Sequence, residues 1–193
     1  MRICVYGAAS PEIDNKYIEE VEKLGVELAK RGHSLVFGGG SGGLMGAAAR
    51  GVTYGGGHIT GISPSFFENE GIEPVYEYCD EVIETKTMRE RKQLMEDNAD
   101  AFVIVPGGIG TFEEFFEIMT LRQLCRHNKP IALYNIMGYY NELEAMMKAG
   151  VEKRFIRSAC EDLYKTTEDM QELFEYLENP QADNHLVEDL KYS

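Results

Sequence analysis

The sequence predicts a single α/β domain in which a mainly parallel, doubly wound sheet has helices on both faces. Three observations support this. The chain has 193 residues, enough for one domain with a substantial core. Strand-like and helix-like segments alternate, as they do where helices connect parallel strands. Two of the strands run directly into glycine-rich turns that open helices.

Short apolar segments are predicted as strands. The run AFVIV at residues 101–105 is the clearest central strand because it is continuously apolar and short. The other predicted strands are residues 2–7, 34–37, 58–62, 130–134 and, at an edge, 163–166. Residues 75–85 are expected to be extended.

The segments between the strands are predicted as helices. The first should begin at Ser10 and Pro11, since serine is a good N-cap and proline suits the first helical turn, and end at Gly32. The others are residues 44–52, 87–98, 111–127, 139–149 and 168–177. Asn179 and Pro180 should end regular structure, so that residues 1–180 form the domain and 181–193 a flexible tail.

Composition excludes some classes of function. The formal net charge of −14 argues against a protein that binds a nucleic acid polymer, because such binding depends on lysines and arginines. No apolar run is long enough to span a membrane, and we read no secretion signal, so we expect a cytoplasmic protein. The four cysteines form no C-x-x-C pair and no zinc spacing with histidine; we expect them to be reduced, with Cys4 and Cys125 in the core.

The first glycine-rich turn, at residues 38–46, reads GGGSGGLMG. It contains G-x-G-x-x-G at Gly38, Gly40 and Gly43, between a strand and a helix, as in dinucleotide-binding proteins. Such proteins also place an acidic residue about 20 residues further on to bind the ribose. Here Ser63 and its neighbours stand near that point and offer no carboxylate. A dinucleotide site, a site for another phosphate, and a purely structural turn all remain open.

The second turn, at residues 106–114, reads PGGIGTFEE and opens a long helix. The N-terminus of a helix offers unpaired N–H groups and partial positive charge, which suit an anion. Thr111 can cap this helix or donate its hydroxyl to a phosphate. Glu113 and Glu114 can simply complement the helix dipole, but we expect one of the two to point back toward the loop and a ligand.

A basic cluster, MRERK at residues 88–92, lies between the two turns. Without context, a solvated helix face would explain it. This helix, however, leads into the strand that bears the second glycine turn, and a right-handed crossover makes such elements neighbours. Arg91 is therefore a candidate partner for a phosphate or a carboxylate.

Together these motifs resemble the Lonely Guy family, the cytokinin riboside 5′-monophosphate phosphoribohydrolases, once called lysine decarboxylases. The family pattern G-G-G-x-x-G-L-M-G matches residues 38–46, and P-G-G-x-G-T-x-x-E matches residues 106–114. The arginine–lysine pair of M-H-x-R-K matches Arg91 and Lys92. Arg89 stands where the family often has histidine, which leaves the preferred base or nucleotide open.

The resemblance implies a Rossmann-like fold and hydrolysis of the N-glycosidic bond of a nucleoside 5′-monophosphate to free base and ribose 5-phosphate. It implies no metal and no organic cofactor, and a homodimer with sites near the subunit interface. Arg91 and Glu114 would be catalytic, with Arg91 holding Glu114 ionised. The substrate-binding residues would be Gly40, Gly43, Met88, Lys92, Gly107, Gly108, Gly110, Thr111, Glu113 and Thr120.

Rival interpretations remain. The main one is a non-catalytic carrier of a nucleotide or of the molybdenum cofactor on the same glycine loops. A nicotinamide-dependent oxidoreductase is a second rival, but this sequence lacks the acidic residue that would bind the ribose of its cofactor. A pyridoxal-phosphate decarboxylase requires a Schiff-base lysine, and neither Lys86 nor Lys92 has a convincing setting for one. The sequence also leaves open whether the base is adenine or a prenylated adenine.

Overall fold

The computed structural model describes residues 1–180 and 185–191, and its centre is a seven-stranded sheet in which all adjacent strands run parallel. The order is β4-β3-β2-β1-β5-β6-β7. The strands are β1 (Arg2–Tyr6), β2 (Ser34–Phe37), β3 (Ile59–Pro64), β4 (Glu81–Thr85), β5 (Ala101–Ile104), β6 (Ile131–Tyr134) and β7 (Lys165–Thr167). The predicted fold class is confirmed, with β5 beside the central strand β1.

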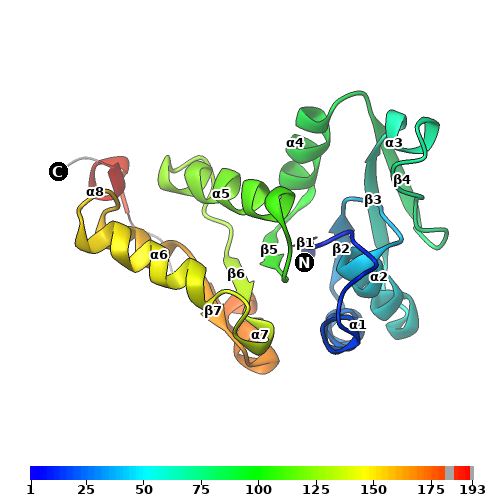
Figure 1. Ribbon diagram of the computed structural model, residues 1–193, viewed down its shortest axis with the longest axis horizontal. Helices are drawn as coiled ribbons and strands as arrows, with labels where there is room; N and C mark the ends of the chain where they lie inside the picture. The colour runs from blue at the N-terminus through cyan, green and yellow to red at the C-terminus, as the bar shows by residue number, and fades with distance from the viewer. Residues whose placement is uncertain (181–184, 192–193) are drawn as a thin grey trace.

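Helices cover both faces of this sheet (Figure 1). Ile3 and Val5 belong to one core cluster and Cys4 and Tyr6 to another, because successive side chains of a strand point to opposite faces. The first cluster includes side chains of α1 (Asn15–Lys30), α2 (Gly43–Gly55) and α7 (Met170–Glu178). The second includes those of α4 (Met88–Asn98), α5 (Ile109–Gln123) and α8 (Val187–Lys191). The remaining helical elements are α3 (Ser65–Asn69), α6 (Asn141–Glu152) and the 3₁₀ turns η1 (Ile136–Gly138) and η2 (Ser158–Leu163).

The strand order places a crevice at one edge of the sheet. From β1 the chain adds β2, β3 and β4 outward on one side, and then returns to pair β5 with the other side of β1. Loops that follow β1 and β5 therefore diverge at the carboxyl edge, where open α/β sheets bind ligands. Both predicted glycine turns lie at this edge, because they follow β2 and β5.

Close packing of α1 against α2 fixes the first glycine turn. A Cβ added to Gly51 would lie 2.0 Å from the carbonyl oxygen of Glu22, so the two helices meet backbone to backbone. The turn of α2 before Gly51 is also made of small residues, with Ala47, Ala48 and Ala49 all buried. This contact leaves the start of α2 directly beneath the crevice.

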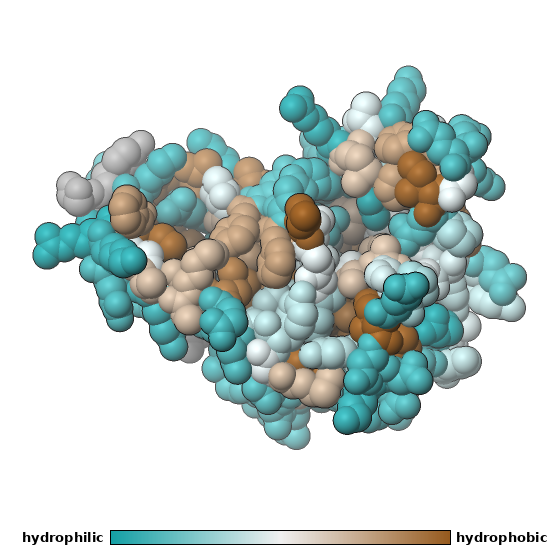
Figure 2. Space-filling view, viewed as in Figure 1, coloured by the Kyte–Doolittle hydropathy of each residue, from teal (hydrophilic) through white to brown (hydrophobic). Residues whose placement is uncertain are grey.

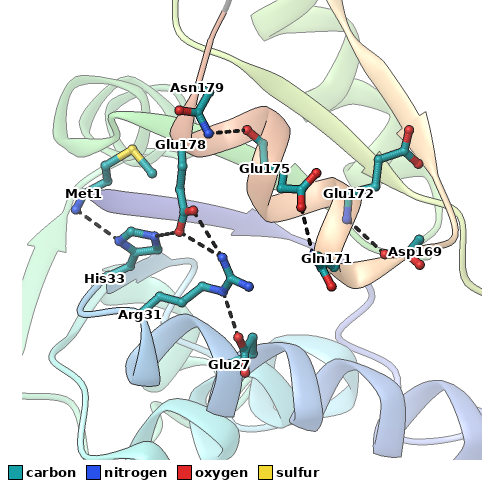
Figure 3. Close-up of polar contacts among 10 residues, drawn as sticks. All are labelled: Met1, Glu27, Arg31, His33, Asp169, Gln171, Glu172, Glu175, Glu178 and Asn179. Carbon is teal, nitrogen blue, oxygen red and sulfur yellow. Dashed lines mark hydrogen bonds and ion pairs between the residues drawn. The ribbon is translucent and has the colours of Figure 1, made fainter.

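Polar contacts join α1 to α7 on the same face (Figure 3). Arg31, just after α1, bonds through Nε to Glu27 at 2.7 Å and through Nη1 to Glu178 at 3.1 Å. His33 Nε2 lies 3.0 Å from the other oxygen of Glu178. At the other end of α7, the Asp169 side chain accepts from the backbone N–H of Glu172. The contacts of Arg31 and His33 with Glu178 thus join the end of α1 to the end of α7.

The structure corrects several expectations. The first helix begins at Asn15, not at Ser10, because Asp14 is its N-cap and accepts from the Lys16 N–H at 2.9 Å. Ser10 and Pro11 remain in the loop after β1. Of the extended segment 75–85, the structure assigns Glu81–Thr85 to a strand, and α3 precedes it without having been predicted. Cys125 is exposed rather than in the core.

The end of the chain differs as well. Regular structure was expected to stop at Pro180, and α8 shows that this is wrong for residues 187–191. Leu190 is 1% exposed, and its carbonyl oxygen accepts from Gln123 Nε2 at 3.1 Å. The rest of the predicted tail, residues 181–184 and 192–193, lies outside the described residues, and its flexibility remains a prediction. In the part that the structure describes, no helix is long and apolar enough to cross a membrane.

Candidate active site

A cavity of about 750 Å³ opens at the carboxyl edge of the sheet. The loops after β1, β2 and β5, the segment after α3, and the first turns of α4 and α5 line it. Seven of the predicted site residues line this cavity: Met88, Arg91, Gly108, Gly110, Thr111, Glu113 and Glu114. The two sequence motifs and the basic cluster therefore meet in one place.

The N-terminus of α5 faces the cavity with free hydrogen-bond donors. Gly108 is the N-cap, and the first intrahelical bond is donated by Phe112 to the Gly108 carbonyl at 3.0 Å. The N–H groups of Ile109, Gly110 and Thr111 precede that bond, so they are available to an acceptor. Helix-end N–H groups and the helix dipole together suit a phosphate.

Two glycines of this turn, Gly108 and Gly110, are not explained by the chain's own packing. A Cβ added to Gly108 or to Gly110 would meet no heavy atom within 4 Å. Both residues have negative φ angles, so their backbone does not require glycine either. Since both line the cavity, a side chain at either position would enter the space where an anion would approach the backbone.

Two tyrosines hold the second glycine turn in place, and the sequence analysis did not single them out. Tyr139 Oη donates to the carbonyl oxygen of Gly107 at 2.5 Å, and Tyr140 Oη donates to that of Val105 at 2.7 Å. Their rings also pack edge to face against each other. These bonds fix the path of the backbone from β5 into α5.

Arg91 extends from the first turn of α4 to the first glycine turn. Thr87 caps α4 by accepting from the Glu90 N–H. The guanidinium of Arg91 is buried, with Nε donating to Ile62 O at 3.1 Å and Nη2 to Gly38 O at 3.0 Å. In the described residues no carboxylate forms an ion pair with it, so its positive charge remains available to the cavity.

Glu114 lies in the first turns of α5 and faces the same space. Burial raises the pKa of its carboxyl to about 7, while Arg91 lowers it and Glu113 raises it further. Arg91 thus acts in the expected direction, but burial outweighs it. A pKa near neutral pH suits a group that exchanges protons during a reaction, because both protonation states are then populated.

Lys92 and Glu113 form a separate group beside the cavity. Lys92 Nζ bonds to Glu113 Oε1 and lies 2.7 Å from Glu117 Oε2. Burial lowers the pKa of Lys92, but the bonds to Glu113 and Glu117 outweigh this and the net direction is upward. Lys92 lines a neighbouring cavity between α4 and α5 rather than the one that holds Arg91. Glu113 borders both.

Four more predicted site residues lie outside the cavity lining. Gly40 and Gly43 support it from behind: a Cβ on Gly40 would collide with Glu73, and one on Gly43 with Ala8. Gly107 leaves room for the Thr111 side chain. Thr120 is exposed, donates to Phe116 O, and stands six residues, or about 9 Å, beyond Glu114 along α5. Roles for these residues in binding remain predictions.

The cavity also has walls that the sequence analysis missed. One is the loop after β1, residues 7–11, which the strand order places at the crevice. The other is the segment from α3 to β4, which contributes Phe67, Ile72, Glu73 and Pro74. An apolar first strand followed by the small residues GAAS was a sequence signal that could have identified the first wall. No local motif marks the second.

Fold and site together define an α/β protein with an anion-binding helix N-terminus, a buried arginine and a partly buried glutamate over one cavity. Residues 45–177 match the family described as "Possible lysine decarboxylase". A protein of Arabidopsis thaliana named cytokinin riboside 5′-monophosphate phosphoribohydrolase is 38% identical over 177 residues, covering 92% of this chain and 81% of its own. A rice protein (Oryza sativa subsp. japonica) with the same name, qualified as probable, is 39% identical over 171 residues, covering 89% and 74%. The chain belongs to this family, that of the Lonely Guy proteins.

Solved structures share the fold at lower identity. The molybdenum cofactor carrier protein from Chlamydomonas reinhardtii superposes with a TM-score of 0.67 at 21% identity, covering 92% of this chain and 95% of that one. The molybdenum cofactor binding protein from Rippkaea orientalis gives 0.66 at 19%, covering 92% and 93%. At these identities the likeness establishes the Rossmann-like fold alone.

Proposed function

We propose that this protein hydrolyses the N-glycosidic bond of an adenine-type nucleoside 5′-monophosphate, either AMP or a cytokinin nucleotide, to the free base and ribose 5-phosphate. The single observation that supports this most is the position of Glu114, which lies one turn from the free N–H groups of α5 and opens onto the same cavity as Arg91. The curated relatives with this activity in their names give it independent support.

The phosphate would sit on the N–H groups of residues 109–111, where Gly108 and Gly110 leave space for it. The ribose would then lie beside Glu114, in the first turns of the same helix. The base would extend across β1 toward β2, into the part of the cavity lined by Met88 and Phe67. Binding the nucleotide at both its phosphate and its base orients the N-glycosidic bond that breaks.

Glu114 would supply the chemistry at the ribose. Breaking the bond between C1′ and the base builds positive charge on the sugar, and an ionised carboxylate stabilises it. The same carboxylate can accept a proton from the water that attacks C1′. Arg91 would hold the nucleotide and favour the ionised form of Glu114, since its own bonds go to neutral carbonyl groups.

Lysine decarboxylation does not fit these residues. That chemistry uses pyridoxal phosphate on a Schiff-base lysine, which must reach the cofactor and lose its proton. Among the described residues that line the cavity there is no lysine. Lys92, the nearest candidate in sequence, is held in ion pairs that raise its pKa. We derive no step through this cofactor.

A passive carrier of the molybdenum cofactor is the alternative. Its ligand is anionic, whereas this cavity presents the carboxylates of Glu73 and Glu114 along with one arginine. A carrier gains nothing from carboxylates that face such a ligand, so these cavity residues favour the hydrolase.

We further propose that the protein acts in the cytoplasm as a homodimer, as the family resemblance implies. Light scattering on the purified protein would test the dimer.

Incubation with a panel of nucleotides tests the proposal. The purified protein should release free base and an equal amount of ribose 5-phosphate from AMP or from an N6-prenylated AMP, detected by chromatography. The matching nucleosides without phosphate should react far more slowly, because they cannot use the N–H groups of α5. Absence of base release from every monophosphate would refute the proposal and favour the carrier.

A further inference from the structure

We propose that Glu73 is the acid that protonates the departing base, an inference that rests on the proposed function. Glu73 lies in the segment between α3 and β4 and lines the same cavity as Glu114 and Arg91. Neither of the family motifs includes it. Two carboxyl groups at opposite ends of one cavity are the arrangement that acid and base catalysis of glycoside hydrolysis requires.

The position of Glu73 is fixed by the first glycine turn. The backbone of its segment bonds to that turn on both sides, with Ser41 N donating to Pro74 O at 3.0 Å and Tyr76 N donating to Gly39 O at 2.8 Å. A Cβ added to Gly40 would lie 1.9 Å from Glu73 Oε1. Gly40 therefore leaves the space in which the carboxyl group sits.

One oxygen of the Glu73 carboxyl group, Oε1, is shielded from water and has no hydrogen-bond donor among the described residues. A buried polar atom without a partner costs free energy, and such atoms in native structures call for an explanation. An oxygen shielded from water and without a donor does not stabilise a negative charge, so this setting favours the protonated carboxyl group.

Geometry separates the tasks of the two glutamates. Glu114 is on α5, which follows β5, and Glu73 sits against the turn that follows β2. These strands are separated by β1, so the two sites are about 10 Å apart along the edge of the sheet. With the phosphate and ribose beside α5, the base is the part of a nucleotide that reaches Glu73.

The surroundings of Glu73 favour a neutral, proton-bearing carboxyl. Phe67, Ile72 and Pro74 line the cavity beside it, and Figure 2 shows apolar side chains gathered over α3, which precedes this segment. Burial raises the pKa of Glu73, although Arg91 lowers it. A bound phosphate adds negative charge to the cavity and favours the protonated form further.

The reaction balances with these two groups. The bond between C1′ and the base nitrogen breaks, and its electron pair goes to the base. Glu73 gives its proton to a ring nitrogen of the base, so the base leaves as a neutral molecule. Water bonds to C1′ and gives a proton to Glu114. Exchange of one proton with solvent at each carboxyl restores the starting state.

Two substrates distinguish this role from a structural one. AMP needs a proton on its base, whereas 4-nitrophenyl β-D-ribofuranoside 5-phosphate releases 4-nitrophenolate, which is stable without one. For Glu73→Gln we expect kcat on AMP to fall by about 10²-fold, the usual range for general acid catalysis. On the nitrophenyl substrate, kcat should stay close to that of the wild type. Glu70→Gln, an exposed neighbour on the same segment, should behave as wild type with both.

Other outcomes overturn the inference. Equal losses on the two substrates would make Glu73 structural, and an unchanged kcat on AMP would remove it from the reaction. Calorimetry should show that Glu73→Gln still binds AMP, so a loss of binding that accounts for the loss of rate also contradicts the role. If the wild type itself releases no base from any monophosphate, the proposed function fails, and that result is distinct from these.

Discussion

Nη2 of Arg91 donates a hydrogen bond to the carbonyl oxygen of Gly38 at 3.0 Å, which joins α4 to the glycine turn after β2. A Cβ at position 38 would lie 1.7 Å from that same nitrogen. The first glycine of the turn is therefore tied to the arginine 53 residues later in the chain. Because Gly38 has no side chain, the Arg91 side chain has room to extend toward the cavity.

Gly38→Ala should displace Arg91 without unfolding the protein, because the atom it meets is the end of a flexible side chain. We expect kcat/KM for base release to fall on the order of 10²-fold, as a misplacement of about 1 Å near a reacting group can cause. The melting temperature should change little. Wild-type turnover in this variant would show that the position of Arg91 is unimportant.

Gly110→Ala should separate stability from binding. Gly110 is within α5, has a negative φ, and would bring its new Cβ within 4 Å of no other atom. Alanine is the better helix former, so the free energy of unfolding should rise by up to about 1 kcal/mol. The methyl group would meet the phosphate, and calorimetry should show weaker AMP binding. Unchanged affinity would mean that the phosphate binds elsewhere.

Local signals explain what the sequence predicted well. The strand at 101–105, the helix at 87–98 and the two glycine turns each depend on neighbouring residues, and the structure has β5, α4 and both turns at these positions. The start of α1 was misplaced because two residues fit an N-cap. Ser10 precedes a proline that suits either a loop or a first helical turn, and it is Asp14 whose side chain accepts from the helix.

Long-range contacts explain what the sequence did not predict. Glu73 reaches the cavity because its segment bonds to a turn over 30 residues earlier, and Tyr139 supports Gly107 across a similar separation. Helix α8 is fixed by Gln123, 67 residues before Leu190. None of these contacts leaves a periodic pattern or a spacing motif in the sequence.

Leu190→Ala tests the packing of α8. The side chain is 1% exposed in the core cluster of α4 and α5. Its truncation should lower the free energy of unfolding by about 2–4 kcal/mol, the usual range for a buried leucine. Leu186 is 65% exposed, so Leu186→Ala is a matched control that should have almost no effect in urea unfolding. Equal behaviour of the two variants would contradict the docking of α8.

The raised pKa of Glu114 predicts a pH-dependent stability. Its pKa is about 7 in the folded protein against an ordinary value of 4.5, so the folded state holds its proton more tightly. The corresponding stability is fully present below pH 4.5 and is lost as the pH rises through about 7. Glu114→Gln should therefore be more stable than the wild type above pH 7, by on the order of 1–3 kcal/mol.

Comparison of the two proteins across pH isolates the contribution of Glu114. The pKa of Glu96 is also raised to about 7 by burial, but Glu96 titrates in both proteins and its effect cancels. Their difference in free energy of unfolding should shrink toward zero as the pH falls to 4.5. A constant difference across this range would show that Glu114 does not titrate as described.

The measurement that tests the account most directly is the rate of base release by Glu114→Gln, with Glu113→Gln as its control. The first change keeps size and hydrogen bonding but removes the charge that stabilises the developing cation. It should lower kcat by about 10²-fold or more while AMP binding persists. Glu113 points about 100° away on α5 and is paired with Lys92, so its variant should be much milder. Near-normal base release by Glu114→Gln would contradict the account.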